Sequence, residues 1–190
     1  MAKKGNERME RIIKSMENQY LLPSLELVED VFAKWDGPEE GKLVRKLVEE
    51  IRSKKYYLPE LELIMVNEND EIIGYAMFSR FHIENRYEDR LLLLSPVAVK
   101  TELQRRHISK DLLEYGFVKA KELGFQAVLV EGNPQNYHSR GFESSYKFGI
   151  EASPAVQLPS PDCLMVKELK AGALAGMHGL VEYSFYEALR

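Results

Sequence analysis

The sequence predicts a single mixed α/β domain, in which a twisted sheet carries helices on both faces. Apolar residues recur at helical spacing over residues 22–52 and then change to the alternation of strands. A strand, a helix and another apolar strand follow one another over residues 90–131, the order of a βαβ unit with parallel strands. The length of 190 residues fits one domain. We expect a disordered N-terminus over residues 1–9 and the domain over residues 10–190, including a C-terminal segment over residues 163–190.

Two helices are predicted near the start of this domain. Over residues 22–35 and again over residues 39–52, apolar side chains recur at intervals of three and four, which gives each helix one buried face. Asp36-Gly37-Pro38 lies between the two stretches and ends the first helix. The two helices therefore form a pair.

Strands follow the helical pair. Residues 61–66 alternate in side-chain direction, residues 67–70 supply turn chemistry, and residues 72–82 continue as a second strand, so the segment predicts a β-hairpin. Residues 90–99 predict a third, more fully buried strand. Its Pro96 lacks the ladder donor, which indicates a bulge or a place where neighbouring strands separate.

A crossover helix comes next. Residues 108–123 have helical periodicity and end at Gly124, and residues 126–130 form the following strand. Because a strand–helix–strand connection of this kind is right-handed, residues 90–99 and 126–130 should lie parallel in one sheet.

Composition excludes several classes of function. The net charge of -4 and the scattered Lys and Arg residues give no footprint for nucleic acid or for an anionic membrane. No Cys/His spacing resembles a zinc site, so we expect no metal. The single Cys163 cannot form an internal disulfide, and no apolar segment is long enough for a membrane span, so a cytoplasmic location is expected.

The loop between the third strand and the crossover helix, residues 101–110, has the geometry of an anion site. The first turn of a helix leaves backbone N–H groups unpaired and carries roughly half a positive charge. A pyrophosphate at this position would satisfy both, and Arg105, Arg106 and Lys110 would add charge.

Residues 95–109 resemble motif A of the GNAT superfamily, in which a strand is followed by Gln or Arg, two variable residues, Gly, one more residue, and Gly or Ala. Gln104, His107 and Ser109 hold the marked positions. Other segments resemble a bacterial subgroup of predicted N-acetyltransferases in this superfamily: Ser95-Pro96-Val97-Ala98-Val99, Gly132-Asn133-Pro134-Gln135-Asn136-Tyr137, Tyr137-His138-Ser139-Arg140-Gly141-Phe142, and the C-terminal stretches 172–176 and 179–183. The resemblance covers most of the chain and implies the GNAT fold, splayed between its fourth and fifth strands, here residues 90–99 and 126–131.

The same resemblance implies an N-acetyltransferase that transfers an acetyl group from acetyl-CoA to a primary amine by direct attack, without a covalent enzyme intermediate. Tyr137, four residues before Gly141, takes the position of the general acid that protonates the leaving thiolate. The implied coenzyme-binding residues lie on the strand and in the loop after it: Val97, Ala98, Val99, Gln104, Arg105, Arg106, His107, Ile108, Ser109 and Lys110.

The acceptor amine must also lose a proton, because an ammonium group with a pKa near ~10.4 is almost entirely non-nucleophilic at neutral pH. Glu131 lies at the end of the strand after the crossover helix, near the strand tips where ligands of open sheets collect. It is the candidate general base.

His107 and Ser109 replace the two glycines of the motif, and the histidine either obstructs the pyrophosphate or turns outward and contributes a contact. Two functional classes therefore stay open. One is an acetyltransferase acting on a small-molecule or peptidyl amine. The other is a degenerate GNAT-fold module that binds CoA or a protein partner without catalysis, with the helical pair and the exposed sheet edge serving protein association, for example in a homodimer.

Overall fold

The computed structural model describes residues 10–189 of the chain. The predicted disordered segment, residues 1–9, lies outside the described residues. The α-helices are α1 (Leu21–Asp36), α2 (Pro38–Arg52), α3 (Ile108–Glu122) and the short α4 (Pro134–Tyr137). The strands are β1 (Ile12–Ser15), β2 (Glu62–Val66), β3 (Ile72–Arg80), β4 (Leu91–Val99), β5 (Ala127–Glu131), β6 (Glu143–Ser144), β7 (Ile150–Ala152), β8 (Leu164–Glu168) and β9 (Gly179–Val181).

The main sheet has seven strands in the order β1-β2-β3-β4-β5-β8-β6. Strands β4 and β5 are parallel, and every other neighbouring pair in this sheet is antiparallel. Strands β7 and β9 pair in parallel as a small second sheet. The predicted hairpin β2–β3 and the predicted β4–α3–β5 unit are confirmed, and so is the mixed sheet.

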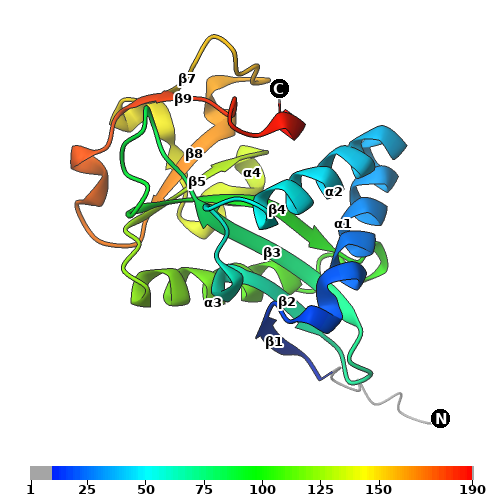
Figure 1. The fold of residues 1–190 in the computed structure, drawn as a ribbon. Coiled ribbons are helices and arrows are strands. Elements are labelled where there is room, and N and C mark those ends of the chain that lie inside the picture. Colours follow the sequence, from blue (N-terminus) through cyan, green and yellow to red (C-terminus); the bar gives the residue numbers. More distant parts are fainter. Residues whose placement is uncertain (1–9, 190) are drawn as a thin grey trace, which may run out of the picture.

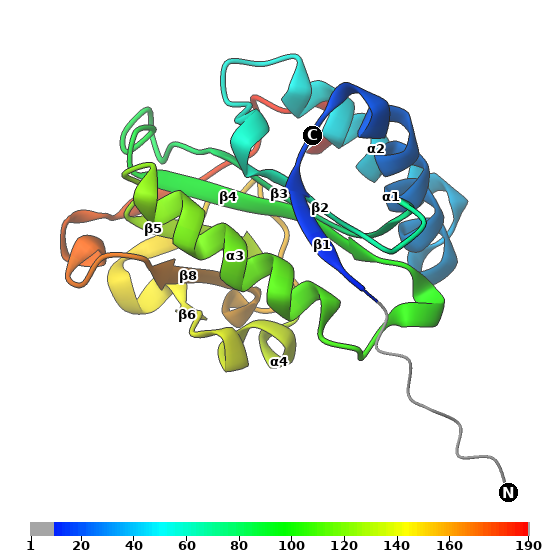
Figure 2. The ribbon, with the colours of Figure 1, turned by 90° about the horizontal axis from the view of Figure 1, so that it is seen from below.

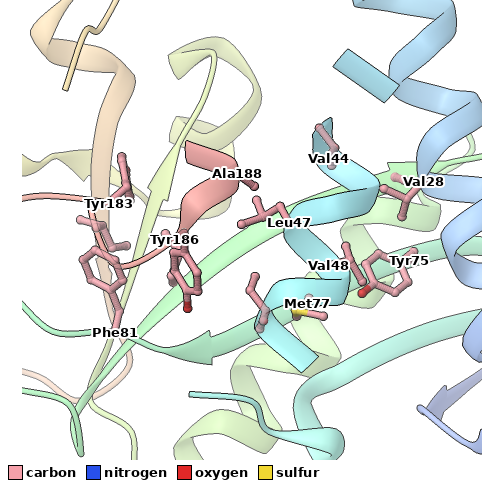
Figure 3. Packing of buried hydrophobic residues seen from close by; sticks show 14 of the residues in the cluster. Val28, Val44, Leu47, Val48, Tyr75, Met77, Phe81, Tyr183, Tyr186 and Ala188 are labelled. Carbon is pink, nitrogen blue, oxygen red and sulfur yellow. The ribbon is translucent and has the colours of Figure 1, made fainter. Parts of the chain in front are cut away.

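Helices cover both faces of the sheet, as predicted. Helices α1 and α2 pack on one face and α3 crosses the other (Figures 1 and 2). Each layer has its own cluster of buried apolar side chains. Figure 3 shows part of the cluster beneath α2, where Val48 of α2 lies near Tyr75 and Met77 of β3, and Leu47 lies near Ala188. The polypeptide thus forms a three-layer domain with the sheet in the middle.

The sheet splays between β4 and β5 at the predicted place. Their parallel pairing runs from Leu91 opposite Ala127 to Leu93 opposite Leu129 and goes no further. The register between β3 and β4 shifts between Ala76 and Phe78, opposite the segment that contains Pro96. Because β5 turns away here, the C-terminal half of β4 has an edge without a neighbouring strand, and this edge forms one wall of the site described below.

Three strands of the main sheet, β1, β6 and β8, were not among the sequence predictions. Strand β1 has four residues and mixes Ile12 and Ile13 with Lys14 and Ser15, which is too short and too polar to give a clear alternation. Strand β8 comes from the C-terminal segment and lies between β5 and β6, so β6 joins the sheet only through it. Because β8 pairs with strands that are distant in the sequence, its own residues contain no local pattern that predicts this pairing.

Candidate active site

A cleft of about 1030 Å³ opens where β4 leaves β5. Its walls are the free edge of β4, the first turns of α3, the C-terminal end of α1, the segment from α4 to the following 3-10 turn (His138–Arg140), and β8. The structure brings most of the predicted site residues together in this cleft: Val97, Val99, Gln104, Arg105, His107, Ile108, Ser109, Lys110 and Tyr137.

The free edge of β4 presents backbone groups to the cleft. The N–H of Lys100 donates to the carbonyl of Ile73 at 3.1 Å, so alternate residues of β4 in this register are hydrogen-bonded to β3. Val97 and Val99 are the residues between, and their N–H and C=O groups therefore point away from β3, toward the gap. The Val99 carbonyl accepts a long hydrogen bond of 3.5 Å from the side chain of Gln104. A ligand with amide groups could pair with this edge as an added strand does.

Ala98 and Arg106 do not line the cleft. The side chain of Ala98 is buried in the cluster on the α1–α2 face, because neighbouring residues of a strand point to opposite faces. The carbonyl of Arg106 accepts a hydrogen bond of 2.7 Å from the Arg11 guanidinium. Neighbouring residues of the predicted coenzyme-binding set therefore differ in whether they line the cleft, which their adjacency in the sequence does not reveal.

The start of α3 forms the cationic end of the cleft. The first backbone bond into the helix runs from the N–H of Asp111 to the carbonyl of His107, so the N–H groups of Ile108, Ser109 and Lys110 lie ahead of it and have no acceptor within the helix. Such a terminus, with its partial positive charge, favours an anion.

His107 takes a backbone conformation that glycine adopts without strain. It caps α3 with φ 64° and ψ 8°, in the left-handed region, and Arg105 two residues earlier has φ 61°. The loop therefore follows a glycine-like path although no glycine is present in it. Replacement of the motif glycine by histidine leaves the path of the backbone intact, and the cost is local strain.

Tyr137 stands in the cleft wall formed by α4. Its ring packs edge-on against Phe142, with centroids 5.5 Å apart, and the Arg140 guanidinium lies over the ring at 5.9 Å. Burial raises the pKa of the Tyr137 hydroxyl, an effect that the Arg140 charge opposes. A Cβ atom added at Gly132 would lie 2.7 Å from Cε2 of Tyr137, so the ring occupies the space that only glycine leaves. The hydroxyl is protonated at neutral pH and can donate a proton.

Glu131 lies at the end of β5 and outside the lining of the cleft. Ala127 and Leu129 of the same strand belong to the cluster on the α1–α2 face, and alternation puts Glu131 on that face too. Burial raises the pKa of the Glu131 carboxyl, and the nearby hydroxyl of Tyr183 opposes this rise. Glu131 and Tyr137 thus flank the gap between β4 and β5 from opposite faces of the sheet.

The cleft also contains residues that the sequence did not single out. Asn136 lies in the quoted segment 132–137 and Arg140 in the quoted segment 137–142, and the resemblance assigned a role to Tyr137 alone in these segments. Lys167 comes from β8, where it shares a face with Met165, and only the sheet pairing brings it to this place. Its ammonium group donates to the carbonyl of Arg140 at 2.9 Å. Trp35 at the end of α1 is 65% exposed and completes the rim.

The charge of the cleft is positive and incompletely balanced. Within residues 10–189, Arg105, Arg140 and Lys167 have no carboxylate within 4.0 Å, while Lys110 pairs with Glu114 at 3.7 Å. The same part of the chain holds no group of three or more His, Cys, Asp or Glu side chains that could bind a metal ion. None of its helices has the length and apolar character needed to cross a membrane.

Comparison with known proteins agrees with this arrangement. Residues 26–149 match the family model described as Acetyltransferase (GNAT) family. The uncharacterized N-acetyltransferase YhbS of Escherichia coli K12 is 28% identical over 140 residues, which cover 73% of this chain and 79% of the relative.

Solved structures of acetyltransferases share the fold. The crystal structure of E. coli YhbS in complex with CoA superposes with a TM-score of 0.79 at 23% identity, covering 92% of this chain and 90% of that one. A GNAT family acetyltransferase from Brucella melitensis in complex with acetyl-CoA gives a TM-score of 0.69 at 20% identity, covering 95% and 99%. The chain therefore belongs to the GNAT acetyltransferase family and is an acyltransferase of that family.

Proposed function

We propose that this protein transfers the acetyl group of acetyl-CoA to an amine by direct attack, with the coenzyme in the cleft between β4 and α3. The observation that carries the proposal is the free edge of β4 beside the N-terminus of α3. Acetyl-CoA contains an amide-bearing pantetheine arm joined to a pyrophosphate, and these two neighbouring features match the two parts.

The residues of the cleft fit this coenzyme. The N–H and C=O groups of Val97 and Val99 would pair with the amides of the pantetheine arm, and an N–H of this strand would stabilise the developing oxyanion. The N–H groups of Ile108, Ser109 and Lys110 would bind the pyrophosphate, with Arg105 adding charge at the rim. Acetyl-CoA supplies an activated thioester, so the protein need not form a covalent bond to the acetyl group.

The opposite placement of Tyr137 and Glu131 supports a division of the proton transfers. Tyr137, protonated at neutral pH, would donate its proton to the leaving sulfur on the α3 face. Glu131 would accept the proton of the amine arriving from the α1–α2 face. Because the pKa of this carboxyl is raised, it is a stronger base than a glutamate of ordinary pKa, and it loses this role as the pH falls below its pKa.

The competing reading, a degenerate module without catalysis, depended on obstruction by His107. Its left-handed backbone favours the catalytic reading, because the loop keeps a path that leaves the N–H groups of α3 accessible. The acceptor, a small-molecule or peptidyl amine, and a cytoplasmic location remain predictions.

Calorimetric titration with acetyl-CoA tests binding, and the release of CoA thiol in the presence of a panel of small amines and peptides with free amino termini tests transfer. We expect a Kd well below 1 mM, which corresponds to a binding free energy more favourable than about -4 kcal/mol. Tyr137→Phe should retain that affinity and lower transfer roughly 10²- to 10⁴-fold. If acetyl-CoA does not bind at millimolar concentration, the proposed reaction is wrong, and only the assignment of the fold stands.

A further inference from the structure

Arg140 makes an unusual set of contacts for a residue to which the sequence pattern assigned no role. One guanidinium nitrogen, Nη2, donates to the hydroxyl of Ser109 at 3.0 Å, and another, Nη1, donates to the carbonyl of Asn136. The group therefore connects the first turn of α3 with α4, two elements that face each other across the cleft.

The same guanidinium faces the ring of Tyr137. Its central carbon lies 5.9 Å from the ring centroid, within the range of a cation–π interaction. The third nitrogen, Nε, is buried and has no hydrogen-bond partner among the residues that the structure describes. No carboxylate of residues 10–189 lies within 4.0 Å of the guanidinium, so its charge acts on the ring without a counter-ion beside it.

The backbone of Arg140 is held independently of its side chain. Lys167 of β8 donates to its carbonyl at 2.9 Å. The next residue, Gly141, has φ 81°, and a Cβ atom there would lie 2.5 Å from the ammonium nitrogen of Lys167. Gly132 closes the other side of the ring, as described above. Tyr137 is thus enclosed by Gly132, Phe142 and Arg140, and Arg140 is in turn fixed from α3 and β8.

We propose that Arg140 is a positioning residue for the reaction of this site: fixed to α3 through Ser109, its guanidinium holds the ring of Tyr137 in the cleft and faces it with an uncompensated positive charge. The inference rests on the proposed function for its consequence in catalysis, but the contact itself does not. Since Ser109 holds the second small-residue position of the coenzyme loop, Arg140 also ties the proton donor to the turn that binds the coenzyme.

Other charged side chains line the same cleft as Tyr137. From α3, Lys110 and Glu114 line the cleft and pair with each other, and from β8, Lys167 lines it as well. Within the tyrosine's own segment, His138 is exposed. Arg140 is the charge that acts on the pKa of Tyr137, and it lowers that pKa against the effect of burial. Removal of the guanidinium should therefore raise the pKa of Tyr137 further.

The test is ¹⁹F NMR of the full chain with 3-fluorotyrosine in place of tyrosine. Tyr137→Phe assigns the resonance, and the other tyrosines serve as internal references. In Arg140→Gln the titration midpoint of residue 137 should rise by about one pH unit. In Arg140→Lys, which retains the charge and loses the planar contacts, the rise should be smaller. Lys147→Gln, which removes an exposed cation outside the cleft, should leave the midpoint unchanged.

Kinetics adds a second measurement. With acetyl-CoA and an accepting amine from the panel, Arg140→Gln should lower kcat about tenfold or more with little change in the KM for acetyl-CoA, and Arg140→Lys should recover part of the loss. An unchanged midpoint for residue 137 in Arg140→Gln would overturn the inference while leaving the proposed reaction intact. If Tyr137→Phe turns over at the full rate, Tyr137 is not the general acid, and Arg140 has no catalytic role through it.

Discussion

Two groups of charged side chains in this molecule differ in whether their charges have partners within the protein. Beneath α2, Glu62 is fully buried and accepts hydrogen bonds from Arg52, Tyr57 and Tyr75, with an Arg52 nitrogen 2.6 Å from its carboxylate. In the cleft, Arg105, Arg140 and Lys167 have no carboxylate partner in the described part of the chain. We call the first group closed, because its charges are balanced within the protein, and the second group is not closed in this sense.

This difference is a physical criterion that distinguishes a group that stabilises the fold from a group that binds a ligand. A buried charge without a partner costs several kcal/mol, so a group that only supports the fold must be satisfied within the protein. The network at Glu62 meets this requirement and links α1, α2, β2 and β3, because Arg52 also donates to Ser24 and to the carbonyl of Leu21. An exposed cation that lacks a partner at the rim of a cleft, as Arg105 does, indicates where an anionic ligand belongs.

The largest effect is expected from breaking the closed group. Glu62→Gln would leave Arg52 with an uncompensated charge in the interior, and the free energy of unfolding should fall by about 3–5 kcal/mol. Urea denaturation measures this loss. Glu39→Gln, which breaks an exposed pair with Lys42, is the control and should leave the midpoint unchanged. If the folded fraction of Glu62→Gln also loses acetyl-CoA binding, the two groups are not independent.

The second prediction changes the space around the proton donor without changing any charge. Gly132→Ala places a Cβ atom 2.7 Å from Cε2 of Tyr137 and must displace the ring. Because misplacement of a reacting group by about 1 Å can cost roughly 100-fold in rate, transfer should fall by this order while acetyl-CoA binding changes little. Gly176→Ala, with nothing within 4 Å of the added atom, is the matched control. Equal activities in the two variants would place the chemistry away from Tyr137.

The third prediction uses two adjacent arginines, of which Arg105 lines the cleft and Arg106 does not. Arg105→Ala should weaken acetyl-CoA binding roughly tenfold at low salt and less at high salt, whereas Arg106→Ala should have little effect. Calorimetry over a range of ionic strength distinguishes them. Equal losses in both variants would indicate general attraction by a basic loop instead of a directed contact.

The smallest effect concerns the left-handed turn at the start of α3. His107→Gly relieves a backbone strain of about 1 kcal/mol, and the melting temperature should rise by about 2–4 °C. Arg106→Gly is the control, because Arg106 is not among the residues with positive φ and a glycine there only adds freedom to the unfolded chain. A lower melting temperature for His107→Gly would mean that the imidazole makes stabilising contacts that outweigh the strain.

The sequence predicted those parts of the fold that depend on local pattern. The apolar periods placed α1, α2 and α3 within a residue or two of their observed bounds, and Pro96 placed the splay of the sheet. Strand β8 was missed because its five residues have meaning only through their pairing with β5 and β6.

The sequence predicted those parts of the candidate site that are formed by backbone groups. The free edge of β4 and the start of α3 follow from the order of elements, and both line the cleft as expected. Which side chains line the cleft did not follow from the sequence: the predicted residues Ala98 and Arg106 are not in its lining, whereas Arg140 and Lys167 are. Residues 140 and 167 meet at the cleft only through the tertiary fold, and a linear motif contains no information about such a meeting.

The position of β8 has a consequence for the order in which the chain can mature during synthesis. The ribosome makes β5 and the segment of Tyr137 well before residues 164–168, and until that strand pairs, the edge of β5 remains without its partner and Arg140 without Lys167. An unpaired apolar edge of this kind invites association with other chains. Nascent polypeptides halted ahead of β8 should therefore engage chaperones and lack the finished cleft, and a short additional length of chain should release them.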